Sequence, residues 1–206
     1  MFEHSISSQA RRQIERVEQF MAGRDDALAI PRVSAEFLHT LVLSGGFRRG
    51  LELGTSFGYS GLWIGSALRH NGGTLVTMDR NADKLTRTRQ TFADAGLATT
   101  ITIQEGTIAD LLPGVAGPFD FVFIDADKEN CPLYLDLVWP KLAHHATLVT
   151  DNITSHREKL ADFAALLRAH PGLTSTLVPI GSGLEVSVKV APTGRQPSVD
   201  GADWVI

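Results

Sequence analysis

A chain of 206 residues, 43% of them hydrophobic and 20% charged, is long enough to fold as one globular domain with a sizeable core. The net charge of −4 argues against nucleic acid as the main partner, and no stretch has the apolar length that a membrane span needs. The single cysteine, Cys131, excludes an internal disulfide, and no signal peptide is visible, so we expect a cytoplasmic protein.

Two helices are expected ahead of the first strand. Residues 7–21 carry apolar side chains at the spacing of one helix face. Ser34 is a typical N-cap residue for a second helix, which we expect to run through Leu43 and to end at the glycine pair 45–46. Residues 1–45 would then form a helical cap. The first helix would cover the domain, close over a ligand or contact a second copy of the chain.

Strands and helices alternate after this cap. The expected strands are residues 49–53, 74–78, 100–104, 119–124 and 146–150, and the expected helices are residues 59–69, 83–95, 108–112, 133–142 and 157–169. Residues 175–179 and 184–190 are predicted to pair as a closing hairpin. The alternation predicts an α/β fold with a doubly wound parallel sheet, right-handed crossovers and helices on both faces. We expect one domain over residues 1–190 and a C-terminal arm over residues 191–206.

A glycine turn joins the first expected strand to the next helix. Gly54 and Gly58 allow the backbone to turn sharply at the strand end, where open α/β sheets bind nucleotide-like ligands. Glu52 would repel a pyrophosphate and suits a ligand with ammonium or hydroxyl donors. Asp79 ends the following strand, where a carboxylate accepts hydrogen bonds from ribose hydroxyls, as it also does in nicotinamide enzymes. The turn lacks the Gly-x-Gly of a dinucleotide site, so adenosine without a pyrophosphate fits better.

Oxygen ligands follow two later strands of the expected sheet. Asp125 ends one strand, and Asp151 and Asn152 follow the next. Carboxyl ends of parallel strands face one crevice, so these oxygens suit Mg²⁺ or a similar divalent ion, with a plain turn as the alternative for the Asp-Asn pair. Lys128 lies in the loop after Asp125. Burial near a metal disfavours the ammonium form of a lysine, so Lys128 is either a general base or a solvated surface residue.

Three segments together resemble a known family. They are Leu-Glu-Leu-Gly-Thr-Ser-Phe-Gly-Tyr-Ser at residues 51–60, Phe-Val-Phe-Ile-Asp-Ala-Asp-Lys at residues 121–128, and the later Asp-Asn pair at 151–152. In this order and spacing they resemble the cation-dependent O-methyltransferases of the catechol and caffeoyl-CoA type, which use S-adenosylmethionine. The resemblance covers about residues 30–190. It implies a Rossmann-like methyltransferase fold, with a mostly parallel seven-stranded sheet and an antiparallel last strand.

The resemblance also implies a cofactor site. Glu52 and Gly54 would line the methionine end of S-adenosylmethionine, and Ser60 would hold its carboxylate. Asp79 would hold the ribose, and residues 106–108 would border the adenine. The residues that we assign to the cofactor are Val33, Glu52, Gly54, Ser60, Asp79, Arg80, Gly106, Thr107, Ile108 and Asp125.

The resemblance further implies a cation site and a catalytic base. Asp125, Asp151 and Asn152 would hold the cation, with Mg²⁺ as the first choice and Mn²⁺ or Ca²⁺ as alternatives. Lys128 would be the base. The acceptor would be a small phenolic compound with two vicinal hydroxyls, and homodimers are common in the family. We therefore expect a homodimer that binds neither nucleic acid nor membranes.

The chain departs from the family pattern at three places. Cys131 stands where the family often has a tyrosine. Residues 181–183 are Gly-Ser-Gly, so Ser182 takes the place of the aspartate in the Gly-Asp-Gly that is common in the family. No glutamate stands just before the last strand, where residues 178–180 are Val-Pro-Ile, to hold a second catechol hydroxyl. These departures concern the acceptor more than the reaction. Two alternatives stay open: a metal-independent methyltransferase that acts on a nucleotide or RNA, and a non-catalytic protein that binds the cofactor.

Overall fold

The computed structural model describes residues 2, 4–27 and 29–190. Seven strands form one sheet in the order β3-β2-β1-β4-β5-β7-β6. The strands are β1 (Arg49–Leu53), β2 (Thr74–Asp79), β3 (Ile101–Glu105), β4 (Phe119–Ile124), β5 (Leu142–Thr150), β6 (Leu173–Val178) and β7 (Leu184–Lys189). β1 to β5 pair in parallel, and β7 lies antiparallel between β5 and β6. This arrangement confirms the doubly wound, mostly parallel sheet with an antiparallel last strand.

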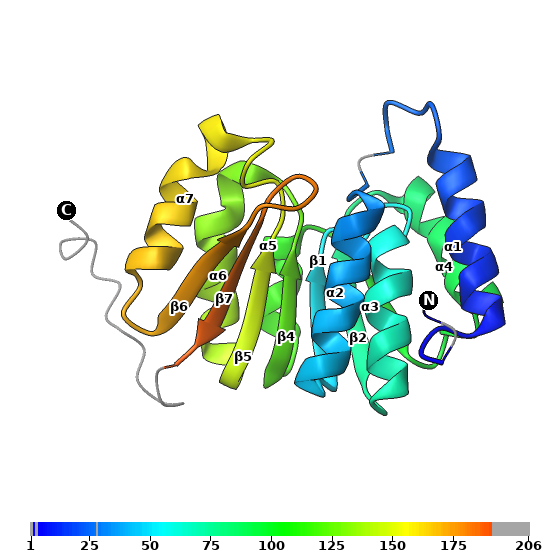
Figure 1. Ribbon diagram of the computed structural model, residues 1–206, viewed down its shortest axis with the longest axis horizontal. Coiled ribbons are helices and arrows are strands. Elements are labelled where there is room, and N and C mark those ends of the chain that lie inside the picture. Colours follow the sequence, from blue (N-terminus) through cyan, green and yellow to red (C-terminus); the bar gives the residue numbers. More distant parts are fainter. Residues whose placement is uncertain (1, 3, 28, 191–206) are drawn as a thin grey trace.

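Helices cover both faces of this sheet, as Figure 1 shows, with α2 and α3 in front of it and α6 behind it. The helices are α1 (Ser8–Met21), α2 (Arg32–Gly45), α3 (Tyr59–His70), α4 (Ala82–Asp94), α5 (Ile108–Leu111), α6 (Cys131–Val138) and α7 (Arg157–Ala169). No helix in the described part of the chain has the length and apolar character of a membrane span. The arm expected over residues 191–206 lies outside the described residues.

The core divides into two apolar clusters because side chains alternate along the strands. In β4, Phe121 and Phe123 join the cluster under α1, α2 and α3, whereas Val122 and Ile124 join the cluster under α6 and α7. All four side chains are almost fully buried. A strand buried on both faces has few polar positions, which explains why residues 121–124 form a continuous apolar run.

The start of α2 differs from the expectation. The helix begins at Arg32 after Pro31, so Ser34 lies inside the first turn and does not cap the helix. Proline presets a backbone angle that suits a helix start, and the N-cap therefore lies three residues earlier, at Pro31 instead of Ser34. The hydroxyl of Ser34 is buried, and no hydrogen-bond partner for it is found in the described residues.

The region between α6 and β5 also differs from the expectation. The helix ends at Val138, four residues early, and Trp139–Lys141 forms a short 3₁₀ turn. Pro140 has no N–H to continue the helical hydrogen bonds, which accounts for the early end. β5 then begins at Leu142, four residues before the expected start, and its pairing with β4 shifts register near Phe119.

Candidate active site

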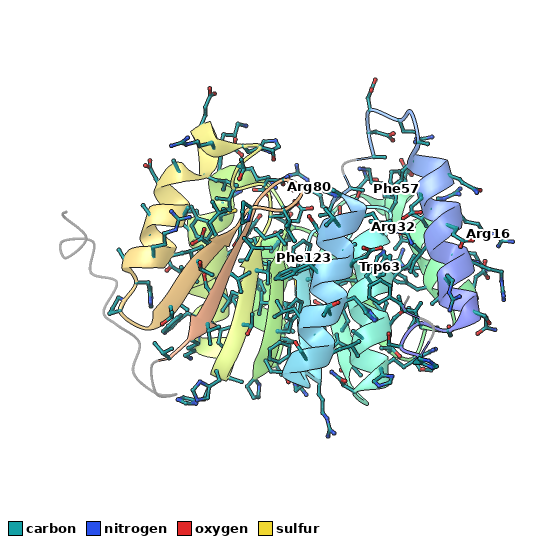
Figure 2. The ribbon with its side chains drawn as sticks, viewed as in Figure 1. Arg16, Arg32, Phe57, Trp63, Arg80 and Phe123 are labelled. Carbon is teal, nitrogen blue, oxygen red and sulfur yellow. The ribbon has the colours of Figure 1, made fainter. Side chains whose placement is uncertain are left out.

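A cavity of about 580 Å³ opens at the carboxyl ends of β1, β2, β4 and β5. Every residue predicted for the site lines this cavity except Val33 and Glu52. Figure 2 shows Arg80 and Phe57, two lining residues, at this edge of the molecule, whereas Phe123 lies lower, within the sheet. Segments from residue 54 to residue 152 therefore meet at one edge, as the parallel topology predicts.

The glycine turn after β1 holds its shape through two backbone bonds. The N–H groups of Gly54 and Thr55 donate to the carbonyl oxygen of Met78 at 3.0 and 3.1 Å. Gly54 has a φ of +108°, and a Cβ there would collide with the backbone carbonyl of Asp125. Only glycine therefore lets the first strand end come this close to the fourth.

Glu52 lies beneath the cavity and does not line it. Its carboxylate is fully buried and accepts hydrogen bonds from Ser60 Oγ at 2.5 Å and Thr77 Oγ1 at 2.6 Å. Burial raises the pKa of Glu52 to about 7, although the two hydroxyls oppose the shift. Glu52 is linked to the cavity through the hydroxyl of Ser60, which does line it.

Asp79 is held at the end of β2 by backbone groups. One carboxylate oxygen accepts from the N–H of Ser56 at 2.7 Å and the other from the N–H of Asn81 at 2.9 Å. The N–H of Gly106 donates to the carbonyl oxygen of Asp79 at 3.0 Å and brings the segment after β3 beside it. The two expected subsites, ribose and adenine, are thus neighbours. Val33 lies on α2, where it is exposed and outside the cavity.

The expected cation ligands gather at the other end of the cavity. Asp125 forms an ion pair with Lys128, whose Nζ lies 2.9 Å from Oδ1 of the carboxylate. Asp151 is buried and accepts from Ser182 Oγ at 2.5 Å. Burial, followed by the negative charge of Asp125, raises the pKa of Asp151 to about 6. Asn152 has a φ of +68°, and its amide nitrogen donates to Ser155, which leaves the amide oxygen as a candidate ligand.

This donor set fits a divalent cation. The negative charge of Asp125 disfavours the ionised form of Asp151, a cation between the two carboxylates would offset this effect, and oxygen donors suit Mg²⁺. Within residues 2, 4–27 and 29–190, no three His, Cys, Asp or Glu side chains are grouped so as to hold a metal. A cation here would thus depend on two carboxylates and an amide, and the acceptor or water would complete the coordination.

Sequence reasoning missed several residues of the cavity wall. Asp127 accepts from the hydroxyl of Tyr134 at 2.6 Å and from the amide of Asn130. Burial opposes the shift, but these hydrogen bonds hold the pKa of Asp127 below its usual range. Met21 and Ile30 line the cavity from the cap side. The Asp-Ala-Asp-Lys motif was a signal for Asp127. Closing over a ligand was one of three expectations for the first helix, but no local pattern singled out Met21 or Ile30.

Comparisons with known proteins agree with this site. A family model described as a methyltransferase domain matches residues 51–153. A catechol O-methyltransferase of Mycobacterium tuberculosis is 33% identical over 170 residues, covering 74% of this chain and 77% of that protein. A catechol O-methyltransferase of Niastella koreensis is 35% identical over 133 residues, covering 62% and 59%.

A solved structure agrees as well. The O-methyltransferase from Bacillus cereus in complex with SAH has a TM-score of 0.78 and 25% sequence identity, covering 92% of this chain and 100% of that one. Together with the glycine turn, the buried Glu52 and the strand-end carboxylates, these matches identify the family. The chain belongs to the O-methyltransferases that use S-adenosylmethionine.

Proposed function

We propose that this O-methyltransferase transfers the methyl group to one hydroxyl of a small aromatic compound with two vicinal hydroxyls, assisted by a divalent cation. The observation that carries the proposal is the position of Asp125, Asp151 and Lys128 in the same cavity as the cofactor residues. The names of two relatives, both catechol O-methyltransferases, support this acceptor class.

The chain itself would contribute a base and an oriented site. A free phenol has a pKa near ~10 and is a weak nucleophile at neutral pH. Nζ of Lys128, in its neutral form, is the atom that would receive the phenol proton, and its contact with Asp125 at 2.9 Å positions it. Asp125, Asp151 and Asn152 would hold the cation, which when bound favours the ionised form of a phenol and orients its two oxygens.

Orientation of the cofactor and the acceptor would lower the reaction barrier more than the base does. The cofactor subsites around Gly54 and Asp79 and the acceptor end around Asp151 belong to one cavity of about 580 Å³. Holding two reactants in line within such a site lowers the barrier by several kcal/mol, with about 7–11 kcal/mol as the upper range. Met21 and Ile30 add an apolar wall, which helps to exclude water.

The test is a methylation assay with caffeic acid and labelled S-adenosylmethionine. We expect EDTA and the substitution Asp151→Ala each to abolish turnover, whereas SAH affinity stays within a few-fold of wild type. Asp162→Ala, an exposed carboxylate on α7, is the matched control and should keep full activity. Full turnover in EDTA would rule out the cation and favour the metal-independent alternative. The homodimer and the cytoplasmic location stay predictions.

A further inference from the structure

The loop between β6 and β7 contacts the turn that carries two expected cation ligands (Figure 1). Ser182 Oγ donates to Asp151 Oδ1 at 2.5 Å. The carbonyl oxygen of Ser182 accepts from the N–H groups of Thr154 at 3.0 Å and Ser155 at 3.1 Å. One residue thus contacts the turn through both its side chain and its backbone.

The two glycines that flank Ser182 restrict its position. Gly181 and Gly183 have φ values of +55° and +83°, which L side chains rarely adopt. A Cβ at Gly183 would collide with Thr154, and a Cβ at Gly181 would collide with the hydroxyl of Ser34 on α2. The loop is therefore packed between the start of α2 and the turn after β5, and the hydroxyl of Ser182 stays directed at Asp151.

A hydrogen bond to one carboxylate oxygen fixes the rotation of the whole group. Terminal torsions of Asp side chains are broad, so a carboxylate without such a bond samples several orientations. Asp151 is 1% exposed, and the bond to Ser182 ties down Oδ1. In metal sites, partners of this kind orient the ligands, and their loss typically lowers metal affinity 10–100-fold.

We propose that Ser182 is a positioning residue of the cation site, which acts through Oδ1 of Asp151 to set the affinity for the divalent ion. The inference rests on the cation site of the proposed function. The role requires a group at this position that can donate a hydrogen to Oδ1 of Asp151. An ionised aspartate there would add a third negative group and has no hydrogen to donate.

The experiment is a Mn²⁺ titration of the full chain, followed by electron paramagnetic resonance, with neither cofactor nor acceptor present. We expect Ser182→Ala to raise the Mn²⁺ Kd about 10–100-fold. Ser182→Thr keeps the hydroxyl and should stay within about 3-fold of wild type. Ser175→Ala is the matched control, because Ser175 bonds to Ser187 on the same hairpin and should leave the Kd unchanged.

Each outcome decides the question. SAH affinity should be equal in all variants, and a parallel loss of SAH binding in Ser182→Ala would overturn a specific role. Equal weakening by Ser182→Thr and Ser182→Ala would also overturn it, since the hydroxyl would not matter. If Ser182→Ala binds Mn²⁺ normally while Asp151→Ala does not, the positioning role fails and the proposed function stands. If wild type binds no Mn²⁺ yet methylates caffeic acid, both fail.

Discussion

Lys128 is the residue whose proposed role depends most on geometry. Its Nζ is 2.9 Å from Asp125, and its side chain is only 13% exposed, so it is no surface lysine. We expect Lys128→Met, which keeps the apolar stem and removes the nitrogen, to lower kcat by about 10²–10⁴-fold, the usual contribution of a general base. Turnover of caffeic acid and SAH affinity by calorimetry are the two measurements, and the affinity should stay within a few-fold of wild type.

A lysine elsewhere in the fold serves as the control for this prediction. Lys141 directly precedes β5, at the opposite end of that strand from the cavity, and donates to the backbone carbonyls of Pro113 and Val115. Lys141→Met should therefore keep normal turnover. An unchanged kcat in Lys128→Met would show that Lys128 is not the base. A loss of SAH binding in step with kcat would show that Lys128 has a structural role instead.

Glu52 predicts a pH dependence of stability. Its pKa rises from an ordinary 4.5 to about 7 on burial, so the folded state favours the protonated form. The protonated carboxyl therefore contributes to the unfolding free energy in full below pH 4.5. This contribution is lost as the pH rises through 7, because the buried group must then ionise. At 1.36 kcal/mol per pKa unit, the loss is about 3 kcal/mol. Between pH 4.5 and pH 8, the unfolding free energy of Glu52→Gln should rise by about this amount relative to wild type.

Urea denaturation at several pH values measures this difference. Asp151, whose pKa is also raised, is present in both proteins, so its contribution largely cancels in the comparison. The two stability curves should diverge between pH 4.5 and pH 7 and run parallel above it. Parallel curves across the whole range would show that Glu52 stays ionised in the folded protein.

The hydrogen bonds around Glu52 also fix the polarity of the cavity floor. Ser60 donates its one hydroxyl hydrogen to the carboxylate, and so does Thr77. Thr55 must then donate to Thr77, 2.6 Å away. With Glu52 ionised, the hydroxyls of Ser60 and Thr55 therefore offer only lone pairs to a ligand. This suits the ammonium group of the cofactor rather than the carboxylate that the resemblance assigned to Ser60.

At the scale of single elements, the sequence predicted best what depends on a strand and its end. Residues 49–53, 119–124 and 157–169 form the expected elements with the expected bounds. The acidic strand ends and the glycine turn meet because parallel strands bring their carboxyl ends to one edge. Knowing the strands was therefore enough to place Asp79, Asp125 and Asp151 together.

Contacts between elements that are distant in sequence could not be predicted in this way. Leu51 and Leu53 face the cluster under α6, so Glu52 between them faces α3 and lies under Ser60. The bond from Ser182 to Asp151 joins residues 31 positions apart. Such contacts depend on how α3 and the last hairpin dock on the sheet, and no local pattern of residues encodes that docking.

For the whole molecule, the cap is an integral part of the fold. α1 packs against α3 and α4, and Glu18 accepts hydrogen bonds from Tyr59 at 2.6 Å and from Arg32. Phe20 near the end of α1 stacks edge-on against Phe57 of the glycine turn. The expectation that the first helix covers the domain is thus met, and its last residue, Met21, also reaches the cavity.

The cavity joins elements from both core clusters, so its ligand should stabilise the whole chain. Gly54 to Ser60 lead into α3 on one face, and Asp127 and Tyr134 belong to the segment that packs on the other. A ligand that binds only the folded state adds about 2.7 kcal/mol at 100 times its Kd. For a chain of this size, each kcal/mol raises Tm by about 2–4 °C. SAH at that concentration should therefore raise Tm by about 5–11 °C in differential scanning calorimetry.

NADH is the matched control for this ligand, because it carries the same adenosine on a pyrophosphate. Asp79 alone would accept the ribose of either ligand, whereas the turn from Gly54 to Gly58 lacks the second close glycine that a pyrophosphate needs. NADH at equal concentration should leave Tm unchanged. An equal Tm shift with NADH would show that the site binds adenosine without selecting the methionine end. An unchanged Tm with SAH would show that the cavity does not bind the expected cofactor.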